Sequence, residues 1–125
     1  MQIYFISKWR HLQELSFAKG GLHTPDKLNS IAALADEALR RAADSRGEWT
    51  GLLVTMSHNY KYPFADQVLI HAQRPGATAC ASYEVWNDTM RRYVRRGAKG
   101  IALVDHSGDA PKLRYVFDIA DTGTR

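Results

Sequence analysis

The chain has 125 residues, 45% of them apolar, which suits one domain that buries a single core without metal or disulfide staples. Its one cysteine, Cys80, excludes an intramolecular disulfide and a cysteine-based metal cluster, and it favours a reducing, cytoplasmic compartment. The 17 Lys and Arg against 13 Asp and Glu give a net charge of +4, which disfavours a DNA mimic because a mimic needs a dense negative surface.

The start of the chain predicts neither a signal peptide nor a membrane span. Residues 3–6 are apolar, but Lys8 and Arg10 follow before a hydrophobic run of signal length develops. No stretch approaches the roughly 18 apolar residues that cross a bilayer, so no membrane partner is expected. Because glycines at residues 20 and 21 form a flexible join, we expect an N-terminal arm at residues 1–23 and the main domain at residues 24–125.

A helix is predicted to begin at Pro25, because Thr24 offers a hydroxyl cap and Asp26 a carboxylate for the first turn. Apolar residues then recur at helical spacing. They are Leu28, Ile31, Leu34, Ala35, Ala38, Leu39 and Ala42. The helix is expected to run to about Ser45, with Gly47 ending it.

Further helices and the first strand of a small sheet are predicted after this helix. A short helix is expected over residues 49–56, and a third from Pro63 to about Gln73, closed by residues 74–76. A buried strand is expected at residues 77–81 and a short helix at residues 83–90, capped by Ser82.

Strand-like residues 101–104 and 114–119, with a polar loop at 106–109, predict an antiparallel hairpin. The predicted fold class is therefore α+β, with N-terminal helices followed by a small, mainly antiparallel sheet that contains a β-hairpin.

The basic segment, which we define as residues 91–99, reads RRYVRRGAK and carries five positive charges and no negative one. A guanidinium group can form two hydrogen bonds to a phosphate and can stack on a base, so the pattern favours a polyanionic ligand such as a nucleic acid. The alternative is a solvated run of surface charges. The candidate phosphate contacts are Arg91, Arg92, Arg95, Arg96 and Lys99, with Lys61 and Arg74 as outer members. Adjacent Arg91 and Arg92 point in different directions on any regular element, so about half of the five cations of the basic segment are expected to face a ligand.

Aromatic residues near the basic segment are candidates for stacking on nucleic-acid bases, each stack being worth about 1–3 kcal/mol. The four candidates are Tyr60, Tyr62, Tyr93 and Trp86. Tyr60 and Tyr62 lie in a predicted loop, where exposure is easy. Trp86, beside Val85 on a predicted helix, also suits a core position.

Catalytic patterns are weak. No two histidines have metal-ligand spacing, and residues 105–109, which combine acid, base and hydroxyl groups, are predicted to form a polar turn. Asp118 and Asp121 show no gathering of carboxylates for Mg²⁺, so a nuclease is a minor alternative. We expect no catalytic residue, no metal and no cofactor, and a chain that is not an enzyme.

The order of motifs from Tyr60 onward resembles the N-terminal single-stranded-DNA-binding domain of the antirestriction protein ArdC family, in its mobile-element version. An aromatic pair precedes a helix with polar residues at Asp66 and Gln67, and L-I-x-x-Q-x-P follows at residues 69–75. A tryptophan and a basic turn lead to V-x-x-G-x-K-G-I at residues 94–101, and V-F-D-x-x-x-T closes the match at residues 116–122.

The resemblance implies a non-catalytic domain that binds single-stranded DNA and protects or handles the DNA of a plasmid or phage. ArdC-type proteins usually continue into a metalloprotease-like region with a His-Glu-x-x-His helix, and this sequence has no such motif. An alternative function that is consistent with the same resemblance is inhibition of a host defence nuclease, of the restriction or CRISPR type, by direct binding to that protein.

Overall fold

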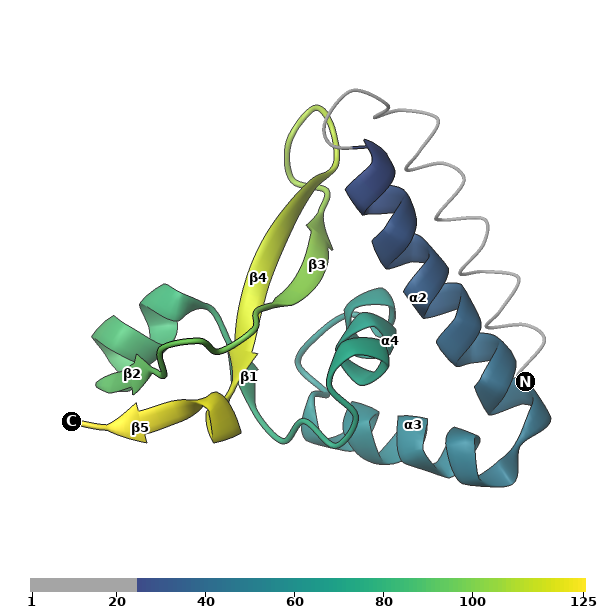
Figure 1. Cartoon of the computed structure of the whole chain (residues 1–125), viewed down its shortest axis with the longest axis horizontal. Coiled ribbons are helices and arrows are strands. Elements are labelled where there is room, and N and C mark those ends of the chain that lie inside the picture. The colour runs from purple at the N-terminus through teal and green to yellow at the C-terminus, as the bar shows by residue number, and fades with distance from the viewer. Residues whose placement is uncertain (1–24) are drawn as a thin grey trace.

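A computed structural model describes residues 25–125, so the predicted arm at residues 1–23 lies outside the described part of the chain. The elements form an α+β fold, as predicted: three helices come first and a small antiparallel sheet follows (Figure 1). The helices are α2 (Pro25–Asp44), α3 (Arg46–His58) and α4 (Phe64–Gln73). None of the helices within residues 25–125 is long and apolar enough to cross a membrane.

The junction between α2 and α3 differs from the prediction. Gly47 was expected to end the first helix, but it lies in the first turn of α3. Ser45 is the N-cap of α3, and its hydroxyl accepts a hydrogen bond from the Glu48 N–H at 3.3 Å. A serine followed three residues later by a glutamate is a helix-start signal, so the cap outweighs the helix-breaking tendency of one glycine.

The core lies between the three helices and one face of the sheet. The apolar stripe of α2 is buried as its spacing predicts, except that Leu34 is 38% exposed. It meets side chains of α3, α4 and the sheet, among them Leu52, Leu69, Ile70 and Leu103, which are 0–1% exposed. Burial of this apolar surface is the main driving force that holds the helices on the sheet.

The main sheet has the strand order β1–β4–β3, with both pairs antiparallel. Its strands are β1 (Cys80–Ala81), β4 (Lys112–Asp118) and β3 (Ile101–Asp105). The β3–β4 pair confirms the predicted hairpin. The first predicted strand, at residues 77–81, is shorter than expected, because only Cys80 and Ala81 pair with β4.

Gln73 joins the last turn of α4 to the outer strand of this sheet. Its Nε2 donates to the Ala102 carbonyl at 2.8 Å, and its Oε1 accepts from the Ala102 N–H at 2.9 Å. The side-chain amide therefore satisfies both backbone groups of Ala102, as a neighbouring strand would do.

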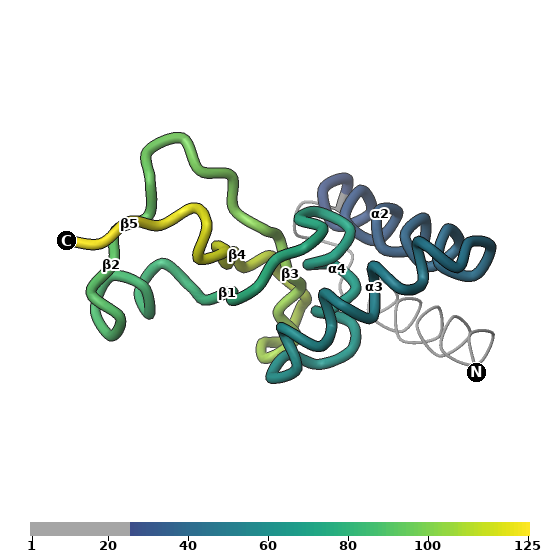
Figure 2. Tube along the Cα trace, turned by 90° about the horizontal axis from the view of Figure 1, so that it is seen from below, coloured from purple at the N-terminus to yellow at the C-terminus, as the bar shows by residue number. Residues whose placement is uncertain are grey.

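A second, two-stranded sheet lies at the end of the molecule remote from α2 and α3 (Figures 1 and 2). We call it the ribbon. It pairs β2 (Arg92–Val94) antiparallel with β5 (Thr122–Thr124), so that Tyr93 lies opposite Gly123. The predicted helix before it, at residues 83–90, is helical, but its central turn, Val85–Thr89, has π-helical bonding, with the Met90 N–H donating to the Val85 carbonyl.

A buried polar cluster fixes α3, α4 and the turn after α4 to one another. The Thr55 hydroxyl, fully buried, lies 2.8 Å from His71 Nδ1 and accepts a hydrogen bond from the Gly76 N–H. Nearby, Asn59 Nδ2 donates to the carbonyls of Thr55 and Ala77, both at 2.9 Å. Buried polar groups of this kind are costly to disrupt, because each partner left alone loses its hydration without replacement.

Acidification is expected to weaken this cluster through His71. Burial is the main cause that lowers the pKa of His71 from its ordinary value of 6.5; Glu48 acts in the opposite direction. The stability that neutral His71 contributes is therefore complete above pH 6.5 and is lost as the pH falls from 6.5 toward the lower pKa of the folded state. We expect the free energy of unfolding in urea to fall over this window in the wild-type protein and to fall less in His71→Gln.

All other titrating groups are common to the two proteins, so the difference between their pH profiles isolates His71. Parallel profiles would show that protonation of His71 does not oppose folding.

Candidate nucleic-acid interface

The ribbon separates the basic segment into side chains that hold the structure and side chains that face solvent. Arg92 is half-buried, and its Nε donates to the Thr122 hydroxyl at 2.8 Å across the ribbon. Tyr93 points to the opposite face, because successive residues of a strand alternate. Arg91, by contrast, is exposed. Of these two neighbouring cations, Arg92 is thus engaged in a structural contact, whereas Arg91 is open to solvent.

Tyr93 lies across Gly123, its partner in the ribbon. A methyl group built on Gly123 would lie 2.5 Å from both Cζ and Oη of Tyr93, so the tyrosine ring occupies the space that a side chain would take. Tyr93 nevertheless remains 43% exposed. One part of the ring is therefore fixed against backbone while the rest is accessible, an arrangement that suits a stacking platform.

A tight turn follows the ribbon and presents the next cations. The Ala98 N–H donates to the Arg95 carbonyl at 3.1 Å, and Gly97 has a φ of 83°, which side-chain-bearing residues rarely adopt. The start of this turn is anchored, since the Arg95 N–H donates to the Asp121 carbonyl at 2.9 Å. The exposed side chains of the turn and its exit are Arg95, Arg96 and Lys99. They lie on the wide loop that leads from β2 to β3 (Figure 2).

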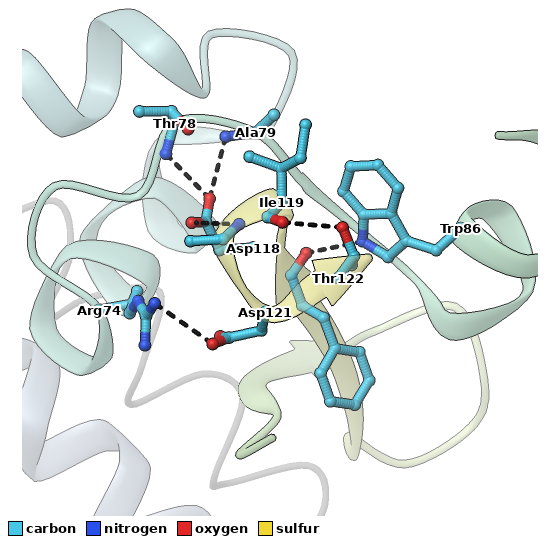
Figure 3. A network of polar contacts seen from close by, with 10 residues as sticks. Arg74, Thr78, Ala79, Trp86, Asp118, Ile119, Asp121 and Thr122 are labelled. Atoms are coloured by element: carbon cyan, nitrogen blue, oxygen red, sulfur yellow. Dashed lines mark hydrogen bonds and ion pairs between the residues drawn. The ribbon is translucent and has the colours of Figure 1, made fainter. Parts of the chain in front are cut away.

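A buried carboxylate holds the ribbon to the main sheet (Figure 3). Asp118, 3% exposed, accepts hydrogen bonds from the N–H groups of Thr78 and Ala79 at 2.9 and 3.1 Å. Its second oxygen accepts from the Ala120 N–H at 3.2 Å and caps the short 3₁₀ turn η2 (Ile119–Asp121). This turn aims the chain from β4 into β5, and the Thr122 hydroxyl closes it by donating to the Ile119 carbonyl at 2.7 Å.

Two predicted site residues contact the segments that join the ribbon to the main sheet. Trp86 is only 3% exposed and its Nε1 donates to the Phe117 carbonyl at 2.8 Å, so its assignment as a stacking residue is wrong. An indole buried in this way has no face open to a base. Arg74, which is partly exposed, forms an ion pair with Asp121 at 3.3 Å and helps to hold η2 in place.

The remaining predicted residues lie in the loop between α3 and α4, on the helical side of the β1–β4 pair (Figure 1). Tyr60 is 72% exposed, and Lys61 is exposed beside it. Tyr62 is half-buried, its hydroxyl donates to the Cys80 carbonyl at 2.9 Å, and burial raises its pKa. Tyr60 and Lys61 are thus available to a ligand, whereas Tyr62 mainly fixes the loop to β1.

The sequence analysis missed two residues of the interface. The sequence around Gly123 does not indicate its importance, because the tyrosine ring that packs on it comes from the other strand of the ribbon. Arg125 was not considered because it lies 26 residues beyond the basic segment, yet its guanidinium donates to the side-chain oxygen of Asn87 in the π-helical turn.

The titratable groups near the ribbon do not assemble into a metal site. No group of three or more His, Cys, Asp or Glu residues suited to a metal ion occurs in the described part of the chain. Burial raises the pKa of the Cys80 thiol to about 12, so it stays protonated at neutral pH and is a poor nucleophile.

In the polar turn after β3, the Ser107 N–H donates to Asp105 at 2.9 Å, which stabilises the turn locally.

Comparison of the chain with known protein families, with curated proteins and with solved structures found no match.

The contact between Tyr93 and Gly123 predicts that substitutions at the two positions have coupled effects on the free energy of unfolding. Gly123→Ala should lower the free energy of unfolding by about 1 kcal/mol, because the added methyl group overlaps the outer end of an exposed tyrosine ring, which has to turn aside. Tyr93→Ala removes the ring, so the double variant should recover much of that loss. A double-mutant cycle in urea should give a coupling of about 0.5–1 kcal/mol. Strict additivity would show that the ring does not rest on Gly123 in solution.

Proposed function

We propose that this chain is a non-catalytic domain that binds single-stranded DNA without strong sequence preference. The observation that carries the proposal is that one short segment, residues 91–99, presents four exposed cations together with one exposed aromatic ring that rests on backbone. The cations are Arg91, Arg95, Arg96 and Lys99, and the ring is that of Tyr93. A protein that binds single strands needs cations that follow the backbone and aromatic faces on which unpaired bases stack.

The charges of these four cations are available to a ligand. The ion pairs within residues 25–125 involve Arg41, Arg74 and Arg114, and none uses a cation of this group. Neutralisation of phosphates by such side chains releases counterions from the nucleic acid, which favours binding and makes it dependent on salt.

The fixed tyrosine favours a single strand over a duplex. Bases in a duplex are stacked on one another, so their faces do not reach a ring on the protein surface without unstacking. Tyr93 is already held against Gly123, so little side-chain freedom is lost when a base stacks on it.

The resemblance to the ArdC family supports the biological part of the proposal, which is protection or handling of the DNA of a mobile element in the cytoplasm. The motifs that carry the resemblance include the basic turn and the V-F-D-x-x-x-T segment. The first supplies exposed cations, and the second supplies Asp118 and Thr122, which hold the ribbon in place.

The test of this function is the replacement of Arg95, Arg96 and Lys99 by alanine. The matched control replaces Arg40, Arg41 and Arg46, which are also exposed cations but lie on α2 and α3, so both triple variants lose the same charge. A fluorescent oligothymidylate titrated at several salt concentrations measures binding. In a plot of log affinity against log salt, the slope should fall by about 2 in the turn variant, at about 0.7 per phosphate contact, and stay near wild type in the control.

Equal losses in the two triple variants would mean that only net charge matters and would refute the assignment to the turn. A duplex of the same sequence should bind more weakly than the single strand.

A second candidate is a protein that inhibits a host defence nuclease by binding it. Tyr83 and Met90, at the two ends of the helical segment before the ribbon, are each 53% exposed and apolar. Aromatic residues, methionine and arginine are enriched in protein interfaces, so this segment also suits a protein partner.

Gel filtration with candidate restriction and CRISPR nucleases, with and without DNA, separates the two functions. Inhibition predicts a binary complex that persists at high salt and is lost in the double variant Tyr83→Ser, Met90→Ser. A complex that forms only through DNA supports the single-strand function.

A further inference from the structure

A shallow depression lies where the π-helical turn meets the end of the ribbon. It is lined by Asn87, Asp88, Arg91 and Arg125. Two of the four are arginines from parts of the chain that are far apart in sequence, and the fold brings their side chains to the same surface hollow. Two cations beside one hollow repel each other, so an anion placed between them relieves that repulsion as well as binding to each.

Hydrogen bonds orient the lining residues. The Arg125 guanidinium donates to the side-chain oxygen of Asn87, and the Asn87 amide nitrogen donates to Asp88 Oδ1 at 2.9 Å. Asn87 is therefore held from both sides. A guanidinium has five N–H donors, so Arg125 keeps most of its donors for a ligand after this one bond.

Arg91 is held at the hollow by an unusual backbone conformation. Its φ is 53°, in the left-handed region, and within residues 25–125 it is the one residue other than glycine with a positive φ. Glycine adopts this conformation without cost, whereas a long side chain such as arginine is uncommon there. The reversal lets Arg91 stay at the end of the π-helical turn while Arg92 enters the ribbon. A strained position occupied by arginine, where glycine would serve the backbone better, indicates that the side chain has a use.

From this geometry we infer that the hollow is a phosphate-binding subsite in which Arg91 and Arg125 hold one phosphate group. The inference rests on the proposed function, because the phosphate is that of a bound nucleic-acid strand, either an internal phosphodiester or a terminal phosphate. Paired guanidinium groups match the oxygens of a phosphate better than ammonium groups do.

Asp88 predicts a change in phosphate affinity opposite in direction to the change caused by loss of Arg91. Its carboxylate lies in the same lining and repels a phosphate, so the site holds the anion less tightly than two arginines alone would. Asp88→Asn removes the repulsion and should raise the affinity for a phosphate ligand, in the opposite direction to loss of Arg91. A hollow with no role in anion binding would not respond to the two changes in opposite directions.

The experiment compares the wild-type protein with Arg91→Gly, Arg91→Asn, Arg91→Lys and Asp88→Asn, all in the full chain. Glycine and asparagine tolerate a positive φ, so both variants should melt at or above the wild-type temperature while they bind an oligothymidylate about threefold more weakly. Their salt slope should fall by about 0.7, and Arg91→Lys should keep most of the slope. Asp88→Asn should bind more tightly than wild type.

The same titrations with and without a 5′-phosphate on the oligonucleotide identify the source of the phosphate. If the 5′-phosphate strengthens binding to wild type and not to Arg91→Gly, the subsite takes a terminal phosphate. If the 5′-phosphate has no effect while Arg91→Gly still lowers the salt slope, it takes an internal phosphodiester.

The subsite and the proposed function fail in different ways. Unchanged affinity and salt slope in Arg91→Gly and Arg91→Asn would overturn the subsite and leave single-strand binding intact. Affinity that falls only in proportion to a lowered melting temperature would also overturn it. If no oligonucleotide binds, but inorganic phosphate shifts the NMR signal of the Arg91 side-chain N–H, the subsite stands and the proposed function is wrong.

Discussion

The carboxylate of Asp118 connects the two parts of this molecule. It is buried at the end of β4, where it accepts backbone hydrogen bonds from the segment before β1 and from η2. A buried charge without partners would cost several kcal/mol, so these N–H groups and the carboxylate depend on one another. Because η2 sets the direction in which the chain leaves the main sheet, the position of β5, and through β5 that of β2, follows from this one group.

The ribbon then decides what the basic segment can do. A run of five cations on a flexible loop would sample many directions, but pairing with β5 fixes the side-chain directions of residues 92–94. Arg92 becomes a structural residue through Thr122, Tyr93 becomes an oriented ring through Gly123, and Arg91 remains at the surface. The exposed cations thus lie in the same short segment as one oriented aromatic ring, whereas a flexible run would present only diffuse positive charge.

Part of this organisation is visible in the sequence, because local patterns determine it. The apolar period of α2, and the strand-like runs on both sides of a polar turn in β3 and β4, each identify an element without reference to the rest of the fold. The ribbon is different. Each of its strands has three residues, and the two lie about 30 residues apart in the chain, so neither shows a pattern and only tertiary pairing reveals them. The sequence could not choose between core and surface for Trp86 for a related reason: burial of a tryptophan depends on residues that the sequence does not place beside it.

The contact of Gln73 with Ala102 also bears on how the protein behaves at high concentration. β3 is an outer strand of the main sheet, and outer strands attract strands of other molecules through their unpaired backbone groups. A foreign strand that approached β3 at Ala102 would first have to displace the amide of Gln73 and break both of its hydrogen bonds. A side chain from α4 therefore protects the edge of β3 at Ala102 from pairing with a strand of another molecule.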